Sequence, residues 1–170
     1  MQIESLTFAD DGDTPNHPVW PLIAYRGAIE AERLRADDHA FDRLFEANGW
    51  PVGFRNGIYR FTHFHSVTHE VLGIARGHAR VQFGGEFGAI LTVGAGDAVL
   101  LPAGTGHRLV ESDGNLLVIG AYPPAAAYDL VRSGEGGGDA VRARIAALPR
   151  PLSDPVLGAA GGLLSEWRPA

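Results

Sequence analysis

Polar and apolar residues divide the N-terminal part of this chain into segments of different predicted structure. Residues 9–18 (ADDGDTPNHP) are polar and rich in turn-forming residues, so they are predicted to form a loop. Residues 19–27 (VWPLIAYRG) then form a short apolar run. Because Pro21 cannot donate a hydrogen bond to a strand ladder, this run is predicted to be an edge strand or an irregular one.

Two segments carry apolar residues at helical spacing. The first lies between Asp37 and Asn48, and Gly49 follows it as a stop signal. The second begins at Asp139, which suits the N-cap position, and is expected to end before Pro149. Their apolar faces consist of Phe41, Leu44 and Phe45 in the first segment, and of Val141, Ile145 and Leu148 in the second.

From about Gly53 to Pro123 the chain alternates between short apolar runs and glycine turns. Strands or strand pieces are predicted at residues 57–65, 70–75, 79–83, 89–93, 98–103, 107–111 and 115–122. Turn signals at this interval, with no helix between the strands, favour an antiparallel sandwich or barrel. The 23 glycines and 11 prolines agree with many turns. The fold is therefore predicted to be all-β with minor helices.

The length of 170 residues fits one domain. Residues 1–52 are expected to form an N-terminal arm and a helix that pack on the barrel, and residues 53–123 its core. Residues 124–170 are expected to add a C-terminal helix and an irregular tail to the same domain. Three apolar residues predict that this tail packs on the rest of the chain: Leu163, Leu164 and Trp167.

The charge and the N-terminus argue against several classes of partner. The net charge is −6 and the basic residues are scattered, so a nucleic-acid-binding role is not expected. No apolar stretch reaches the roughly 18 residues that span a bilayer. The first residues, MQIE, contain neither a basic region nor a long apolar segment. A cytoplasmic location is therefore expected.

The chain contains no cysteine, which excludes disulfides, thiolate nucleophiles, iron–sulfur clusters and Cys-based zinc sites. A transition metal in this protein would have to be bound by imidazole and carboxylate groups. The candidates are seven histidines and twenty acidic residues.

Histidines two residues apart in a predicted strand form the first candidate site. His63 and His65 emerge on the same face, where two imidazoles can chelate one divalent ion. Glu70 is five residues past His65 and would face the opposite way in an unbroken strand. A turn at residues 66–68 would reset this alternation, so that Glu70 faces inward and His69 outward. A bulge would reverse this arrangement.

Two aromatic residues share the alternation of the histidine pair. Tyr59 and Phe61 are predicted to point inward, with Phe61 in the barrel core and the Tyr59 hydroxyl near a cavity. The histidines predicted to lie on the surface are His17, His39 and His78. The aromatic residues expected to pack a barrel mouth or a subunit contact are Trp20, Tyr25, Trp50 and Trp167.

His107 follows a turn-rich segment, residues 102–106, which can deliver a histidine from a distant strand into the same interior. On its own it identifies no site. With the glycines around it, however, it completes a family pattern. The first cupin motif, G-x5-H-x-H-x4-E-x6-G, is matched by Gly57, His63, His65, Glu70 and Gly77. The second, G-x5-P-x-G-x2-H-x3-N, is matched by Gly96, Pro102, Gly104 and His107, with Glu111 in place of the asparagine.

The chain thus resembles the cupins over its central part, and a closer likeness covers nearly its whole length. The phrases NGIYRFTHFHSVTHEVLGIARG, LLPAGTGH and GAYPP are similar to the YjlB-type bacterial cupins, from which no reaction can be carried over. The resemblance implies a jelly-roll barrel, a cupin double-stranded β-helix. It also implies a metal held in the barrel mouth by His63, His65, Glu70 and His107. Glu111 stands at a position that is not a ligand in the family.

Four protein ligands leave one or two coordination positions open, which is typical of a catalytic metal. The leading hypothesis is a dioxygenase-like enzyme that acts on a small organic molecule, with Glu70 and Tyr59 as candidate catalytic residues. A metal-dependent isomerase or lyase fits the same residues, and so does a non-catalytic module that binds a small ligand. The ligand types accommodate Fe, Mn, Ni, Co, Zn or Cu. The resemblance also suggests a homodimer.

Overall fold

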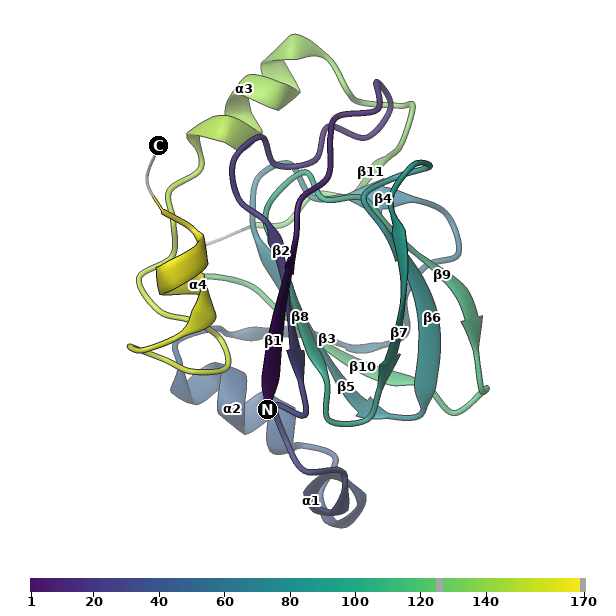
Figure 1. Cartoon of the computed structure of the whole chain (residues 1–170), viewed down its shortest axis with the longest axis vertical. Helices are drawn as coiled ribbons and strands as arrows, with labels where there is room; N and C mark the ends of the chain where they lie inside the picture. Colours follow the sequence, from purple (N-terminus) through teal and green to yellow (C-terminus); the bar gives the residue numbers. More distant parts are fainter. Residues whose placement is uncertain (125–126, 169–170) are drawn as a thin grey trace.

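The strands form two antiparallel sheets that face each other across a barrel interior (Figure 1). The computed structural model describes residues 1–124 and 127–168. Residues 125–126 and 169–170, in the predicted C-terminal segment, lie outside this part. Within it, the six-stranded sheet has the order β1 (Gln2–Leu6), β2 (Leu22–Arg26), β8 (Ala98–Leu101), β5 (Glu70–Arg76), β10 (Leu117–Ala121) and β3 (Val52–Asn56). The five-stranded sheet has the order β11 (Val131–Arg132), β4 (His63–Phe64), β9 (His107–Ser112), β6 (His78–Phe83) and β7 (Ala89–Gly94).

The chain passes repeatedly from one sheet to the other. It runs from β4 to β5, back to β6 and β7, and then through β8, β9 and β10 in alternate sheets. This winding of antiparallel strands is the jelly-roll arrangement. The predicted all-β barrel with minor helices is therefore confirmed. No helix in the described part of the chain is both long enough and apolar enough to cross a bilayer.

The six-stranded sheet is buried on both faces in its centre. Along β5, β8 and β2, alternate residues enter two separate apolar cores because successive side chains point to opposite faces. The core inside the barrel includes Leu22, Ala24, Leu72, Ile74, Val81, Phe83, Val99 and Leu101. The core outside it includes Ile23, Tyr25, Phe41, Phe45, Trp50, Val71, Leu100, Leu163 and Trp167.

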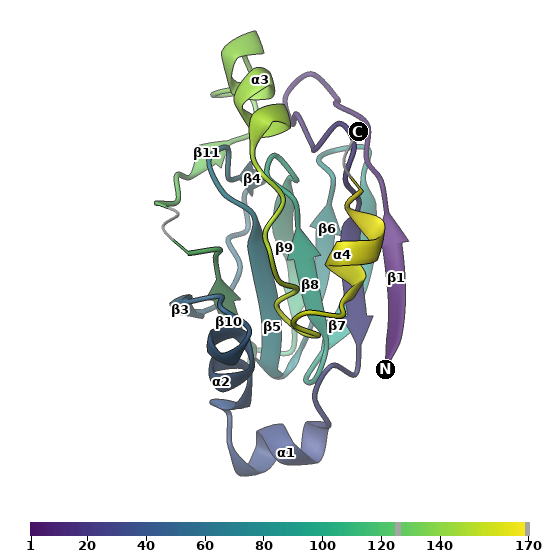
Figure 2. The same cartoon turned by 90° about the vertical axis from the view of Figure 1, so that its left-hand side faces the viewer.

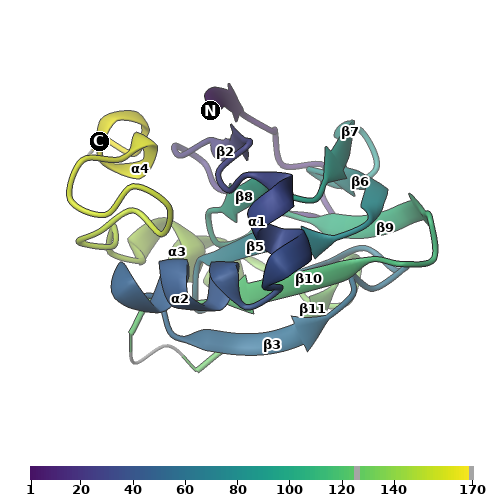
Figure 3. The same cartoon turned by 90° about the horizontal axis from the view of Figure 1, so that it is seen from below.

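Helices and the C-terminal tail cover the outer face of this sheet, as Figures 2 and 3 show. The covering helices are α1 (Ala31–Ala36), α2 (Ala40–Ala47) and α4 (Gly162–Glu166), whereas α3 (Asp139–Ala147) packs through Ile145 on Phe64 and Ala103 at one end of the barrel. The tail is attached through Asp154, which is fully buried and accepts a hydrogen bond from the Tyr25 hydroxyl. The same carboxylate accepts three backbone N–H bonds of 2.8 Å, from Val156, Leu157 and Leu163. The expected packing of the tail is confirmed.

Several local predictions were wrong. Residues 22–26 form an interior strand and not an edge strand, because Pro21 precedes the ladder and β1 supplies the outer neighbour. The predicted helix at 37–48 is shorter, and the separate helix α1 precedes it. The pattern did not predict β1, β3, β11, α1 or α4. Tyr25, Trp50 and Trp167 are buried in the outer core, so they line no barrel mouth.

The segment at residues 57–65 also differs from the prediction. Only His63 and Phe64 form a strand, while residues 57–62 are irregular. Alternation therefore does not hold between Tyr59 and His63. Phe61 is only partly buried and lies under the guanidinium group of Arg132, 3.9 Å from its ring centroid, so it does not fill the core.

One glycine allows the helix and the sheet to approach closely. A Cβ atom at Gly73 would lie 2.6 Å from the ring of Phe41 and 2.9 Å from that of Phe45, both on α2. Contacts this short force aromatic rings or backbone to move, because buried rings have no free space to enter. The close packing of α2 on β5 therefore requires a residue without a side chain at position 73.

We expect Gly73→Ala to lower the free energy of unfolding by roughly 1–3 kcal/mol, since it overpacks this contact. Gly94→Ala is the matched control, because a Cβ there meets only ordinary contacts, at 3.8 Å from the His78 Cβ. Urea unfolding followed by circular dichroism measures both. Equal stability of the two variants would contradict the packing described here.

Candidate metal centre

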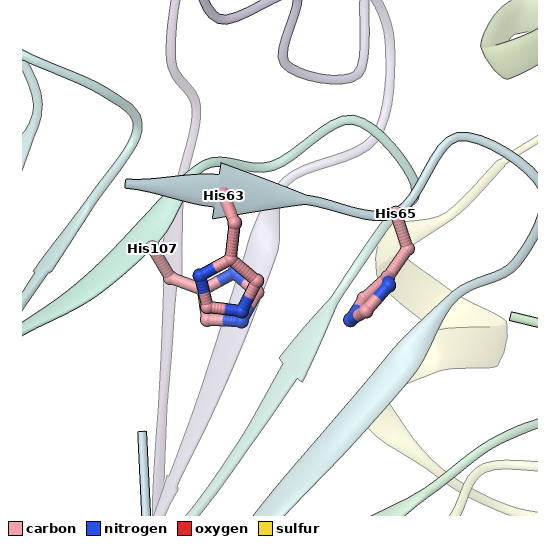
Figure 4. A group of neighbouring side chains, drawn as sticks. All are labelled: His63, His65 and His107. Atoms are coloured by element: carbon pink, nitrogen blue, oxygen red, sulfur yellow. The ribbon is translucent and has the colours of Figure 1, made fainter. Parts of the chain in front are cut away.

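Three histidines meet at one end of the barrel. His63 lies on β4 and is paired in register with His107, the first residue of β9, while His65 directly follows β4. All three side chains are buried. Their imidazole rings offer nitrogen atoms that all lie within 4.8 Å of one another (Figure 4). The centroids of the His63 and His107 rings are 4.1 Å apart, and His65 is 5.9 Å from His63.

A carboxylate from the facing sheet joins this group. Glu70 is the first residue of β5 and has the same alternation as Leu72 and Ile74, which face the barrel interior. Its Oε2 atom is 3.3 Å from Nε2 of His65 and 3.3 Å from Nε2 of His107. The chain bends at residues 66–67 between the two sheets, as the inward direction of Glu70 required. The four side chains selected from the motifs therefore lie together.

The imidazole rings are oriented by backbone carbonyl groups. Nδ1 of His63 lies 3.2 Å from the carbonyl oxygen of Phe61, and Nδ1 of His107 lies 3.1 Å from that of Thr105. Nδ1 of His65 contacts the carbonyl oxygen of Asp129. A carbonyl can only accept, so each Nδ1 carries a proton and donates it. In the neutral rings, the lone pair is then on Nε2, the atom that faces Glu70 in His65 and His107.

The Glu70 carboxylate is buried and unequally paired. Its Oε1 accepts a 2.8 Å hydrogen bond from the Tyr122 hydroxyl. Its Oε2 has no hydrogen-bond partner among the described residues. Burial favours the protonated acid, but His65 and His107 outweigh this effect and hold the pKa of Glu70 well below its usual range. The carboxylate is therefore an anion.

The pKa values of two of the histidines move in opposite directions. Burial lowers the pKa of His63 to about 3, and the neighbouring His107 adds to this effect. Burial also acts against protonation of His65, but the Glu70 carboxylate outweighs it and raises the pKa of His65 to about 9. The anionic Glu70 thus favours a positive charge next to it.

These features fit a divalent transition metal. An unpaired buried carboxylate oxygen and imidazole Nε2 atoms that face it are ligands that such ions prefer. A cation at this point would give Oε2 the partner that it lacks. The buried histidine cluster therefore fits a metal-binding protein of the cupin type.

A cavity of about 230 Å³ opens above the four side chains. Tyr59 lines this cavity, but its side chain is 55% exposed. It therefore lies at the mouth of the cavity, and the prediction that it points into the barrel was wrong. Its ring meets the His63 ring edge-on at 5.3 Å. The irregular backbone at residues 57–62 explains the difference, because Tyr59 and His63 do not share one strand.

The residues that complete this cavity were not predicted from the sequence. Tyr122 directly follows β10, and its hydroxyl donates the hydrogen bond to Glu70 described above. Gly53 leaves space for the Tyr122 ring, because a Cβ atom at position 53 would lie 2.5 Å from a ring carbon. Tyr128 and Leu130 form the outer wall. The phrase GAYPP contains Tyr122, but nothing in the pattern linked it to the histidines.

Asp129 connects the outer wall to His65. Its carbonyl oxygen contacts Nδ1 of His65, and its carboxylate accepts bonds from the backbone N–H (2.8 Å) and the hydroxyl (2.5 Å) of Ser66. Arg144 on α3 also reaches the Ser66 hydroxyl, at 3.2 Å. One residue therefore holds both the cavity wall and a candidate ligand. No periodic signal marks it, because the chain there is mostly irregular.

Comparison with known proteins identifies the family of the chain. No family model matches it. The chain is 36% identical over 169 residues to the "Uncharacterized protein YjlB" of Bacillus subtilis (strain 168), which covers 98% of this chain and 99% of that protein. An identity of this size over the full length of both proteins shows the family. The chain belongs to the YjlB family of cupins.

Solved structures with a likeness to this YjlB-family chain are more distant. An oxalate decarboxylase is 21% identical over 66% of the chain, with a TM-score of 0.36, and the chain spans only 23% of that protein. A DUF861 family protein from Thermotoga maritima is 17% identical over 58% of the chain and 96% of its own length, with a TM-score of 0.35. TM-scores this low carry no argument about function.

Behind Glu70, this member of the YjlB family buries a second pair of histidines. His69 points outward from the barrel as predicted, but it is buried beneath the tail. Its Nδ1 accepts a 3.0 Å hydrogen bond from the backbone N–H of Ala103, in the turn that leads to His107, and its Nε2 contacts the carbonyl of Pro149 at 3.2 Å. His69 thus joins β5, this turn and the tail.

His17 was wrongly predicted to lie on the surface, whereas His39 and His78 are exposed as expected. Its ring stacks on Trp20, with centroids 4.4 Å apart, and its Nδ1 accepts hydrogen bonds from the backbone N–H groups of Val19 and Trp20. Burial lowers the pKa of His17 to about 4.

Glu111 stands at the motif position that departs from the family pattern. Its side chain is exposed, and its Oε2 atom lies 3.6 Å from a guanidinium nitrogen of Arg80.

The pKa of His17 in the folded chain lies below its ordinary value of 6.5, so the unfolded chain takes up a proton first as the pH falls. The free energy of unfolding is therefore unaffected by His17 above pH 6.5 and decreases as the pH drops towards 4. We expect this histidine to cost roughly 1–3 kcal/mol of stability over that interval. His17→Asn keeps an acceptor near the position of Nδ1 but does not titrate, so its stability should depend less on pH. Urea unfolding from pH 7.5 to 4 measures this dependence, and identical slopes would refute the assignment.

Proposed function

We propose that the chain is a metal-dependent enzyme of the oxygenase type that acts on a small organic molecule. One observation carries the proposal: imidazole nitrogens and an unpaired carboxylate oxygen converge at the base of a cavity that is open to solvent through Tyr59 and Tyr128. A purely structural metal is enclosed by its protein ligands, whereas a catalytic one leaves a position open to a substrate.

In this proposal His63, His65, Glu70 and His107 hold one divalent ion. An imidazole that binds a metal through Nε2 carries no proton on that atom and is neutral, so the three histidines would contribute no charge and Glu70 would neutralise one of the two positive charges of the ion. The donor set contains nitrogen and oxygen but no sulfur, which accommodates Fe, Mn, Ni, Co, Zn or Cu. Such an ion supplies Lewis acidity and, if it is redox-active, a centre for the activation of dioxygen.

The residues around the ion would orient Glu70, limit the access of water and supply a proton. The Tyr122 hydroxyl holds Oε1 of Glu70 at 2.8 Å, which leaves Oε2 directed at the histidines. The apolar walls at Phe54, Leu72 and Leu130 reduce the access of water. Tyr59, at the mouth, is the candidate proton donor through its Oη atom.

The metal site is tested by removing its histidines. We expect the double variant His63→Ala/His107→Ala to lose stoichiometric metal, because two of the four ligands are gone. His39→Ala/His78→Ala is the matched control, since both of these side chains are exposed and lie outside the cavity. Metal analysis of the purified proteins after reconstitution measures the content. Full metal content in the first variant would contradict the ligand assignment.

The enzyme class is tested separately with the reconstituted protein. We expect dioxygen uptake that depends on both the bound metal and an organic substrate, measured with an oxygen electrode against a panel of catechols, flavonols, thiols and keto acids. The metal-depleted protein is the control. Turnover without oxygen uptake would replace the oxygenase by an isomerase or lyase. Tight binding without any turnover would instead identify a binding module.

A further inference from the structure

The cavity above the histidines has imidazole and carboxylate groups at its base and, within residues 1–124 and 127–168, no arginine, lysine or aspartate in its walls. The histidine and carboxylate side chains of the lining are the four at the base: His63, His65, Glu70 and His107. The remaining wall consists of the apolar residues Phe54, Ile58, Leu72 and Leu130, the tyrosines Tyr59, Tyr122 and Tyr128, and Asn56 and Gly57. The chain has 14 basic residues, all arginine, yet none of those in the described part lines the cavity.

This distribution limits the charge of a ligand. A phosphate or carboxylate group away from the base would find no arginine or lysine to pair with, and burying an unpaired charge is costly. At the base, a divalent ion and the anionic Glu70 would together leave one positive charge. A ligand with one negative charge on its metal-binding atoms would neutralise it. This step rests on the proposed function.

The size of the cavity limits the ligand further. A cavity of about 150 Å³ is enough to bind benzene in an engineered protein. The volume of about 230 Å³ here therefore leaves room for one six-membered ring and a few substituents.

Aromatic rings beside two of the histidines favour a flat ligand. Tyr128 stacks on Tyr122, with centroids 4.8 Å apart and planes at 11°, and it meets the His65 ring edge-on at 6.0 Å. Tyr59 stacks on Phe61 at 4.9 Å. Tyr59 and Tyr128 both border the cavity, so an aromatic ring that enters it can pack against them.

We infer that the cavity takes a single-ring aromatic molecule that binds the metal through adjacent oxygen atoms and carries no charge elsewhere. The walls disfavour phosphate esters and dicarboxylates, because a charge away from the metal would have no cationic partner among the wall residues that the structure describes. Tyr128 is the residue that selects for the ring, because its side chain forms the outer wall and touches no group that holds the metal other than His65.

A pair of isosteric probes tests the charge requirement. We expect the full chain loaded with Zn(II), which is redox-inert, to bind 3,4-dihydroxybenzamide at least about tenfold more tightly than 3,4-dihydroxybenzoate, since only the second probe buries an unpaired carboxylate. Leu130→Arg adds a cation to the wall at a half-exposed position and should reduce this preference. Isothermal titration calorimetry measures all four affinities.

A ring-free probe tests the requirement for an aromatic ligand. Acetohydroxamate offers adjacent oxygen atoms without a ring. We expect Tyr128→Ala to weaken the binding of 3,4-dihydroxybenzamide by about tenfold and to leave that of acetohydroxamate unchanged. Equal affinity for the amide and the acid, or equal losses for the amide and acetohydroxamate, with Zn(II) retained, would overturn the ligand class but not the metal site. A chain that retains no Zn(II) would overturn both.

Discussion

A negative charge buried under imidazole rings is the constraint on which this structure depends. The Glu70 side chain is almost completely buried, so water cannot stabilise its carboxylate and neighbouring groups must do so. Tyr122 donates to one oxygen, while His65 and His107 face the other. These groups come from separate strands and turns, which must therefore meet at one point. Backbone carbonyls orient the imidazoles, so that Nε2 of His65 and Nε2 of His107 are both directed at the same carboxylate oxygen, where a bound cation would contact all three atoms.

The direction of that charge follows from a strand that is buried on both faces. At the start of β5, Glu70 and Leu72 enter the barrel, whereas Val71 enters the outer core and His69, which directly precedes the strand, lies against Trp167 on the same outer side. A shift of one residue in register would exchange the two sets. It would place an imidazole that now connects the tail inside the barrel, and the carboxylate under the tryptophans. The aromatic and helical cover outside the sheet thus contributes to the arrangement of the site inside it.

The parts of the fold with a regular period were predictable from sequence. The strands from β5 to β10 alternate with glycine turns, and the motif spacing selected the four residues that the structure brings together. The rest depends on tertiary contacts that no period records. Tyr122 reaches Glu70 only because Gly53 leaves space for its ring, and His17 is buried only because a loop folds against Trp20. Residues 57–62 have the composition of a strand, but they do not form the regular backbone hydrogen bonds to a neighbouring strand that would make them one. Whether the selected residues bind a metal stays a prediction.

Asp129 gives the cavity a property that neither its wall nor its base has alone. Its neighbours Tyr128 and Leu130 form the outer wall, while its own carbonyl and carboxylate hold His65 and Ser66. The entrance of the cavity and the orientation of His65 therefore depend on the same three-residue segment, residues 128–130. Any displacement of this segment that widens the entrance also strains or breaks the bond that orients His65. Access to the centre and the geometry of the centre are in this way coupled variables.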